Sequence, residues 1–301
     1  MTLIVIGGAT ATGKSELALD VAERIGAEIV NADSMQLYKG MDIGTAKVPI
    51  SLRRGIPHHL LDVLDVTQES SVADYQRDAR ARIDHLLEKE IPVVVVGGTG
   101  LYIKALIDEL NFPDRDPKVR ERLFIEAEEV GASAMHERLT KLDPDAAALI
   151  PEQNVRRVIR ALEVIELTGE PYAASLPRNE ASYYPQAKQF AIQVEREVLN
   201  ERITNRVKQM WSDGFVDEVR ALAERGLQEG RTARAAIGYA QVLAALEGQM
   251  ELSAAMEETL VSTRQYARRQ ATWFVRDPRI TWLTGSRAEL LERVLASSGN
   301  S

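Results

Sequence analysis

The sequence predicts an α/β fold: a parallel sheet of the P-loop NTPase type, flanked by helices, with an inserted all-helical subdomain. Three observations predict it. Short apolar strands alternate with amphipathic helices over residues 3–109, as in a doubly wound parallel sheet. A complete G-x-x-x-x-G-K-[ST] motif joins the first strand to the first helix. From about residue 117 to residue 187 the pattern is helical alone.

Apolar patterning predicts the elements of the sheet region. The run Ile91–Val96 is short and rich in β-branched residues, as buried parallel strands are. On the helix expected at 14–25, Leu17, Val21 and Ile25 form one apolar stripe. The expected strands are 3–6, 28–32, 91–96, 190–194 and 280–283. The expected helices are 14–25, 72–89, 100–109, 196–213, 214–226, 234–248 and 252–275, with a polar loop at 38–47 and an apolar stretch at 60–66.

The run Asn111–Pro117, rich in proline and aspartate, ends the alternation of strands and helices. The segments that follow are the expected helices 117–130, 133–141, 143–149 and 153–168 and a polar stretch 171–188. A strand then resumes, which is what an insertion into an α/β domain produces. We therefore expect residues 1–111 and 189–301 to form a P-loop catalytic core and residues 112–188 to form a helical insertion.

The P-loop motif predicts a site for two linked phosphates. Its residues are Gly8, Ala9, Thr10, Ala11, Thr12, Gly13, Lys14 and Ser15. A strand that enters a helix through such a turn directs backbone N–H groups and the positive end of the helix dipole at one point. Lys14 adds a full positive charge, and the Ser15 hydroxyl is a candidate ligand for Mg²⁺.

The neighbouring strand ends do not complete a kinase-type site. The strand 91–96 ends in Gly97-Gly98-Thr99 instead of the aspartate that holds Mg²⁺ in many P-loop enzymes. The glycines suit close approach to a ligand, and Thr99 is either a hydrogen-bond donor to the phosphates or the N-cap of the next helix. The strand 28–32 is followed by Asp33, which could cap a helix, bind Mg²⁺ or act as a general base; the residues alone leave these open.

Composition excludes several classes of function. The 301 residues include no cysteine, which excludes disulfides, thiolate zinc sites and thiol catalysis. The four histidines lack the spacing of a histidine metal site. The N-terminus enters a strand at once, and no apolar run reaches the length of a membrane span. We therefore expect a cytoplasmic protein that does not associate with a membrane.

One segment is basic, although the chain carries a net charge of −8. Residues 259–279 contain five arginines and one acid, with Tyr266, Trp273 and Phe274 among them. Arg264, Arg268 and Arg269, called the arginine face below, fall on neighbouring positions of the expected helix. Arginines interleaved with aromatic residues hold phosphate backbones and stack on unpaired bases. The alternative is an ordinary solvated face of an amphipathic helix.

Taken together, the motifs resemble the bacterial tRNA dimethylallyltransferases (tRNA isopentenyltransferases). The matching segments run from end to end of the chain in the family's order. They are the P-loop, Asp33–Gln36, Tyr38–Lys47, Pro57–Leu60, Gly97–Tyr102, Arg160–Val164, Gly238-Tyr239 and Arg264–Trp273. One departure is visible, because the family often has basic residues close to the Gly-Tyr pair on both sides, whereas this chain has Arg234 and Ala240.

The resemblance implies transfer of a dimethylallyl group from dimethylallyl diphosphate to N6 of the adenosine just 3′ of the anticodon of a tRNA. It implies Asp33, Thr99 and Lys14 as catalytic residues, Mg²⁺ as cofactor, and a monomer whose helical insertion contacts the tRNA anticodon stem-loop. The implied tRNA-binding residues are Asp33, Ser34, Met35, Gln36, Thr99, Arg120, Arg156, Arg157, Arg160, Gly238, Tyr239, Gln241, Arg264, Arg268 and Arg269.

Other classes of function also fit part of the pattern. A small-molecule P-loop kinase would bind ATP tightly but would leave Gly97-Gly98-Thr99 and the arginine face without a role. A nucleotide-gated RNA-binding switch would tolerate loss of Asp33. An adenylate isopentenyltransferase, which uses a free nucleotide as acceptor, would share the P-loop and the acid but would not need the insertion.

Overall fold

The computed structural model describes residues 2–110, 112–113, 115–172 and 181–298. Part of the predicted polar stretch 171–188 therefore lies outside the described residues. Residue 111, where the first segment of the predicted core ends, also lies outside them. The chain forms two compact units, which are considered separately. The core unit comprises Met1–Asp108 and Ser182–Ser301, and the insertion unit comprises Glu109–Ala181.

The second boundary lies earlier than the predicted end of the insertion at residue 188, because residues 182–184 are attached to the core. Ser182 pairs with Asp108 in an isolated antiparallel bridge. The Tyr184 side chain is buried, and its hydroxyl donates to Asp84 Oδ1 at 2.7 Å. A polar sequence thus hides one aromatic residue that belongs to the core.

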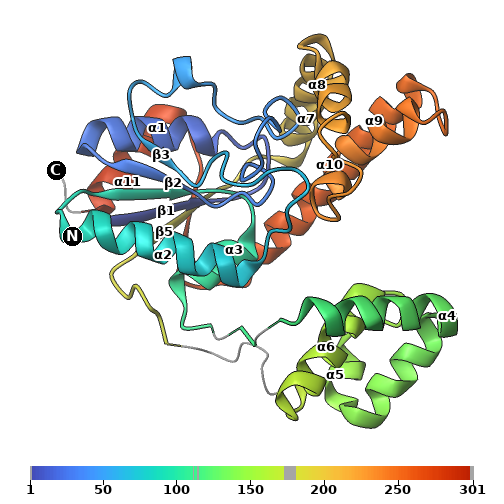
Figure 1. The fold of residues 1–301 in the computed structure, drawn as a ribbon. Helices are drawn as coiled ribbons and strands as arrows, with labels where there is room; N and C mark the ends of the chain where they lie inside the picture. The colour runs from blue at the N-terminus through green and yellow to red at the C-terminus, as the bar shows by residue number, and fades with distance from the viewer. Residues whose placement is uncertain (1, 111, 114, 173–180, 299–301) are drawn as a thin grey trace. The chain divides into compact units, whose positions relative to one another are not determined.

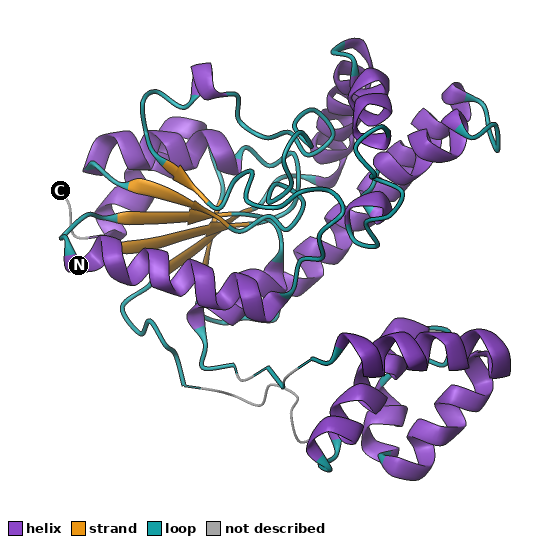
Figure 2. Cartoon of the chain, viewed as in Figure 1, coloured by secondary structure: helices purple, strands orange, loops and turns teal. Residues whose placement is uncertain are grey.

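The core unit contains a six-stranded sheet in the order β3-β2-β4-β1-β5-β6, and every adjacent pair is parallel (Figure 2). The strands are β1 Leu3–Gly7, β2 Glu28–Asn31, β3 His58–His59, β4 Val93–Val96, β5 Lys188–Ile192 and β6 Ile280–Leu283. The predicted fold class is confirmed. The sequence did not predict β3, since a two-residue strand has too few positions to show a periodic pattern.

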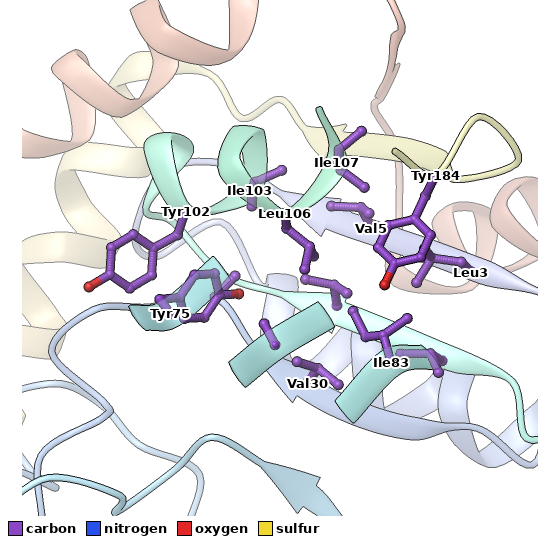
Figure 3. Close-up of a cluster of buried hydrophobic side chains, with 14 of the residues drawn as sticks. Leu3, Val5, Val30, Tyr75, Ile83, Tyr102, Ile103, Leu106, Ile107 and Tyr184 are labelled. Atoms are coloured by element: carbon purple, nitrogen blue, oxygen red, sulfur yellow. The ribbon is translucent and has the colours of Figure 1, made fainter. Parts of the chain in front are cut away.

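Helices cover both faces of the sheet (Figure 1). The helices α2 Val72–Glu88 and α3 Gly100–Ile107 pack on one face, and α1 Lys14–Ile25 and α11 Arg287–Ser298 on the other. Alternate strand residues supply the two cores: Leu3 and Val5 face α2 and α3 (Figure 3), whereas Ile4 and Ile6 face α1 and α11. Helix α11 is not among the predicted elements, because it buries only a narrow stripe that includes Leu290 and Val294.

A second group of helices lies beyond the carboxyl ends of the strands (Figure 1). These are α7 Arg196–Ser212, α8 Phe215–Ala223, α9 Tyr239–Leu246 and α10 Leu252–Val275. The bounds of α10 are those predicted. The helix predicted at 234–248 is shorter, because Gly238 with φ of 90° interrupts it ahead of α9.

The insertion unit contains α4 Pro117–Leu142, α5 Pro144–Leu149 and α6 Val155–Thr168 around a small apolar core of its own. Gly131, with φ of 84°, breaks the helical backbone of α4, in agreement with the two segments predicted on either side of it. Across the part of the chain that the structure describes, we find no helix with both the length and the apolarity to cross a membrane.

Candidate active site

The P-loop connects β1 to α1 as predicted. Gly13, immediately before α1, has φ of 92°, which a residue with a side chain adopts only with strain. The Thr12 hydroxyl donates to the Ala9 carbonyl at 2.9 Å. Ala9 and Ala11 are buried in a cluster with residues of α7 and α10. The loop therefore packs against helices that are remote in sequence.

Lys14, the first residue of α1, is half-buried and lines the P-loop cavity. Its Nζ donates to the Ala9 carbonyl at 3.2 Å. Burial lowers the pKa of Lys14 from the usual 10.5 to about 8; nearby Asp33 opposes this change and Arg206 reinforces it. An anion placed beside Lys14 would favour the charged form, which is the requirement of a diphosphate site.

Arg206, on α7, is a second cation at this site, and no sequence motif indicates it. Its Nη1 donates to the Thr10 hydroxyl at 3.1 Å. Burial lowers its pKa, an effect that Glu16 partly offsets. Among the described residues, no carboxylate lies within salt-bridge distance of Arg206. A cation without a counter-charge beside a P-loop is suited to bind a phosphate.

Two cavities meet at the P-loop. The P-loop cavity has a volume of about 550 Å³, and Lys14, Ser15 and Gln36 are among its lining residues. The aromatic cavity has a volume of about 340 Å³, and Met210, Phe215, Tyr239 and Tyr266 are among its lining residues. Five residues line both cavities: Thr10, Asp33, Thr45, Ala46 and Arg206. A phosphate group in the first cavity and an apolar or aromatic group in the second would therefore meet beside Asp33.

Asp33 is half-buried at this junction and does not cap a helix. Its Oδ1 accepts a hydrogen bond from the Met35 N–H at 3.0 Å, and its own N–H donates to Asn31 Oδ1 at 2.9 Å. Within the described residues its second oxygen, Oδ2, accepts no hydrogen bond. The helix-cap interpretation is wrong, because no helix begins after Asp33. A general base or a metal ligand fits this geometry.

Thr99 directly precedes α3, but its hydroxyl does not cap the helix. The hydroxyl instead accepts a hydrogen bond from the Ser34 N–H at 3.1 Å, which ties the end of β4 to the loop that carries Asp33. Burial raises the pKa of Tyr266 to about 12; the charge of Asp33 adds to the rise, and hydrogen bonding with Thr99 and Gln270 opposes it. Thr99 is therefore the N-cap residue of α3 by position, but its hydroxyl supports the loop that carries Asp33 instead of capping the helix.

The glycines of this motif allow close packing of protein segments, and Gly97 also lines the P-loop cavity. A Cβ added to Gly97 would overlap the Ala32 carbonyl, and one added to Gly98 would overlap the Gln270 amide. One added to Gly100 would overlap the Trp273 ring. The neighbours that approach so closely are β2 and α10, so these glycines allow protein segments to pack.

The Gly238-Tyr239 pair also lies inside the protein. Tyr239 is fully buried, and its hydroxyl donates to Glu218 Oε1 at 2.6 Å. Gln241 Oε1 accepts from the Gly238 N–H at 2.8 Å. Glu218 also accepts the N–H groups of Asp42, Ile43 and Gly44 at 3.1, 2.7 and 3.2 Å. The structure therefore places this predicted tRNA-contacting motif in the wall of the aromatic cavity, where it holds the turn that carries Thr45 and Ala46.

The other predicted tRNA-binding residues fall into separate places. Ser34 and Met35 line the aromatic cavity, and Gln36 lines the P-loop cavity with its amide donating to the Thr45 carbonyl at 3.1 Å. The arginine face is exposed on α10, and its member Arg269 also lines the aromatic cavity.

In the insertion unit, Arg156 and Arg157 are exposed and Arg120 is half-buried. Arg160 differs from them, because its guanidinium is engaged within the unit. It pairs with Glu163 at 2.9 Å and donates to the Pro113 carbonyl at 2.8 Å.

A metal site made by the protein alone is not evident. No group of three or more acids or histidines in the described part of the chain is arranged to hold a metal ion. Mg²⁺ bound here would need oxygen ligands from a substrate, with Ser15 and Asp33 as the protein groups nearby. That donor set fits Mg²⁺, which usually keeps several waters and binds through substrate phosphates.

Comparison with known proteins identifies the family. Residues 36–277 match the family model described as IPP transferase. The chain belongs to the IPP transferase family. A tRNA dimethylallyltransferase of Streptomyces griseus is 52% identical over 296 residues, which is 97% of this chain and 94% of that protein. One from Thermobifida fusca is 53% identical over 300 residues, 98% of this chain and 93% of that protein.

Solved structures agree with this assignment. A tRNA isopentenylpyrophosphate transferase from Bacillus halodurans has 37% identity and a TM-score of 0.72, covering 99% of this chain and 96% of that one. A eukaryotic dimethylallyltransferase acting on tRNA has 27% identity and a TM-score of 0.83, covering 99% of this chain and 79% of that one. The predicted membership in a family of tRNA prenyltransferases is confirmed, and the kinase and switch interpretations are not needed.

Proposed function

We propose that this chain transfers the dimethylallyl group of dimethylallyl diphosphate to N6 of the adenosine 3′-adjacent to the anticodon in tRNA, releasing diphosphate. The observation that carries the proposal is the position of Asp33, which lines both the P-loop cavity and the aromatic cavity. Relatives of about this length that are half identical to the chain carry the name tRNA dimethylallyltransferase.

The P-loop cavity supplies what the leaving diphosphate requires. As the bond between C1 of the donor and the diphosphate oxygen breaks, negative charge grows on the diphosphate. Lys14 and Arg206 carry positive charge at this position, and the P-loop N–H groups next to α1 add to it. Mg²⁺, held by the diphosphate with the Ser15 hydroxyl, would neutralise further charge there.

The junction supplies what the acceptor requires. The exocyclic amine of adenine is a weak nucleophile, because its lone pair is delocalised into the ring. As the N6–C1 bond forms, an N6 proton moves to the unoccupied Oδ2 of Asp33, which acts as general base. A stacked base cannot reach a half-buried carboxylate that lines these cavities, so the adenosine must flip out of the anticodon loop. The apolar walls formed by Met210 and Phe215 would keep water from intercepting the allylic cation character.

Arginines near the aromatic cavity would hold the tRNA itself. The arginine face is exposed, and Arg269 reaches the cavity that would admit the base. The net charge of −8 means that local contacts must supply the attraction to RNA. The exposed Arg156 and Arg157 of the insertion unit are further candidates for such contacts. A tRNA acceptor also places the proposed reaction in the cytoplasm.

The test is transfer of label from radiolabelled dimethylallyl diphosphate to bulk tRNA from cells that lack the modification, followed by nucleoside analysis. We expect labelled N6-dimethylallyladenosine from the wild type and a large loss with Lys14→Ala. Parallel reactions contain AMP or ATP in place of tRNA. Label in the free nucleotide at a comparable rate would make the chain an adenylate isopentenyltransferase, and phosphate transfer from ATP would make it a kinase.

A further inference from the structure

Helix α10 packs against the carboxyl ends of β1 and β4 through a series of glycines. A Cβ on Gly7 would overlap Phe274, one on Gly98 would overlap Gln270, and one on Gly100 would overlap Trp273. Trp273 and Phe274 follow Gln270 by three and four positions, so the three residues lie on one face of the helix. The glycines thus bring this face of α10 to within contact of the strand ends that surround the P-loop.

Gln270 is the polar member of this face, and both ends of its amide are engaged. Only 5% of the residue is exposed. Its Oε1 accepts from the Thr10 N–H at 2.9 Å, and its Nε2 donates to the Gly98 carbonyl at 2.8 Å. Since the two bonds need an acceptor on one side and a donor on the other, they fix the orientation of the amide.

Thr10 is the P-loop residue that lines both cavities, and two long-range contacts hold it. Gln270 binds its N–H, and Arg206 donates to its hydroxyl at 3.1 Å. The Thr10 N–H therefore points toward α10, where it donates its hydrogen bond to Gln270. If Gln270 released it, the buried N–H would seek another acceptor, and the contact with Arg206 would change at the same time.

We propose that Gln270 is a positioning residue that holds the P-loop at Thr10 in the shape that binds the donor diphosphate. This inference rests on the proposed function for the identity of the donor. The role is separate from that of the arginine face, which lies on the exposed side of the same helix. Loss of the Gln270 contacts should weaken diphosphate binding about tenfold, the effect of one good hydrogen bond, with little change in affinity for tRNA.

Two substitutions distinguish the two bonds. Gln270→Leu removes both. Gln270→Glu is nearly isosteric: its ionised carboxylate still accepts from Thr10 N–H but is repelled by the Gly98 carbonyl, whereas its protonated form donates to that carbonyl and restores both bonds. The matched control is Gln265→Leu, since Gln265 is exposed on the same helix.

The measurements are calorimetric titration with inorganic diphosphate and Mg²⁺, and KM values for donor and tRNA separately. For Gln270→Leu we expect donor KM and diphosphate Kd to rise while the KM for tRNA stays near that of the wild type. For Gln270→Glu, the ratio of its diphosphate Kd to the wild-type value should fall toward one as the pH is lowered. Taking the ratio cancels the titration of the diphosphate itself. What remains is the titration of the introduced carboxylate and its coupling to the charged groups near the amide: Asp33, Lys14, Arg206, Tyr266 and Arg269.

The role of Gln270 is overturned if folded Gln270→Leu binds diphosphate as tightly as Gln265→Leu does, or if the Kd ratio of Gln270→Glu is independent of pH. Equal losses for donor and tRNA would indicate general structural damage and would also overturn it. The proposed function is tested separately by transfer of label in the wild type. Diphosphate binding reports on Gln270 whether or not that transfer occurs.

Discussion

Donor use should decline as the pH rises through about 8, because Lys14 then loses its charge in the free protein. Burial lowers the pKa of Lys14 from 10.5 to about 8. This difference corresponds to about 3 kcal/mol by which the fold disfavours the charged form. Because the pKa is lower in the folded state, charged Lys14 destabilises the fold by this full amount below about pH 8. The destabilisation disappears as the pH rises from about 8 to about 10.5. A bound diphosphate has the opposite effect and favours the ammonium form.

The assay is kcat/KM for dimethylallyl diphosphate at saturating tRNA, from about pH 6.5 to about pH 10, since kcat/KM reports the ionisation of the free enzyme. We expect a decline toward tenfold per pH unit above about 8. The same limb should be absent in kcat, because bound diphosphate raises the pKa of Lys14. In Lys14→Arg the limb should disappear, since guanidinium stays charged throughout. A flat wild-type profile, or a limb retained in Lys14→Arg, would refute the reasoning.

Three further outcomes are expected. Asp33→Asn should lower kcat by about two to four orders of magnitude with diphosphate affinity unchanged, and a rate within a few-fold of wild type in single-turnover assays would exclude a general base. Tyr239→Phe should cost about 2 kcal/mol in denaturant unfolding, through loss of its bond to Glu218, without weakening tRNA binding; weaker binding at unchanged stability would restore its predicted contact. Alanine at all three positions of the arginine face should weaken tRNA binding and lower the log–log salt slope by about 0.7 to 0.9 per lost phosphate contact, with donor affinity unchanged.

The parts of the fold that were predicted correctly are those encoded by short stretches of sequence. The P-loop is contiguous, and the strands around it are short β-branched runs, so local pattern was sufficient. The bounds of α10 are also set locally, by the length of one helical pattern. Failures occurred where tertiary contacts decide, as for β3, which pairs with β2 through only two residues, and for Tyr184, which the core buries within a polar segment.

The residues of the site, like the elements of the fold, could be predicted only where they lie in or beside a contiguous motif. Lys14 and Asp33 lie within or beside recognisable motifs, and the structure brings both to one place. Arg206 reaches Thr10 across 196 positions of sequence, and Gln270 reaches it across 260. No local pattern distinguishes Arg206 from the other exposed or half-buried arginines of the helices. Its importance comes from its lack of a carboxylate partner among the described residues, and that property exists only in the folded protein.

Some residues that carry the family resemblance direct their polar groups at other parts of the protein, and others direct them at the cavities. Lys47, in the matching segment Tyr38–Lys47, is buried and donates to the Tyr38 carbonyl and to the carboxylates of Asp42 and Asp62, at 2.9, 2.6 and 2.6 Å. These three acceptors engage the three donors of the Lys47 ammonium group, although Lys47 also lines the P-loop cavity. Its role is to hold the turn that places Thr45 and Ala46 opposite Asp33. Lys14, by contrast, has among the described residues only a neutral carbonyl as hydrogen-bond partner, and its pKa is lowered by burial, so a diphosphate would supply a counter-charge. Two lysines from the matching segments thus differ in their hydrogen-bond partners. Lys47 binds two carboxylates of the protein, whereas Lys14 binds a carbonyl.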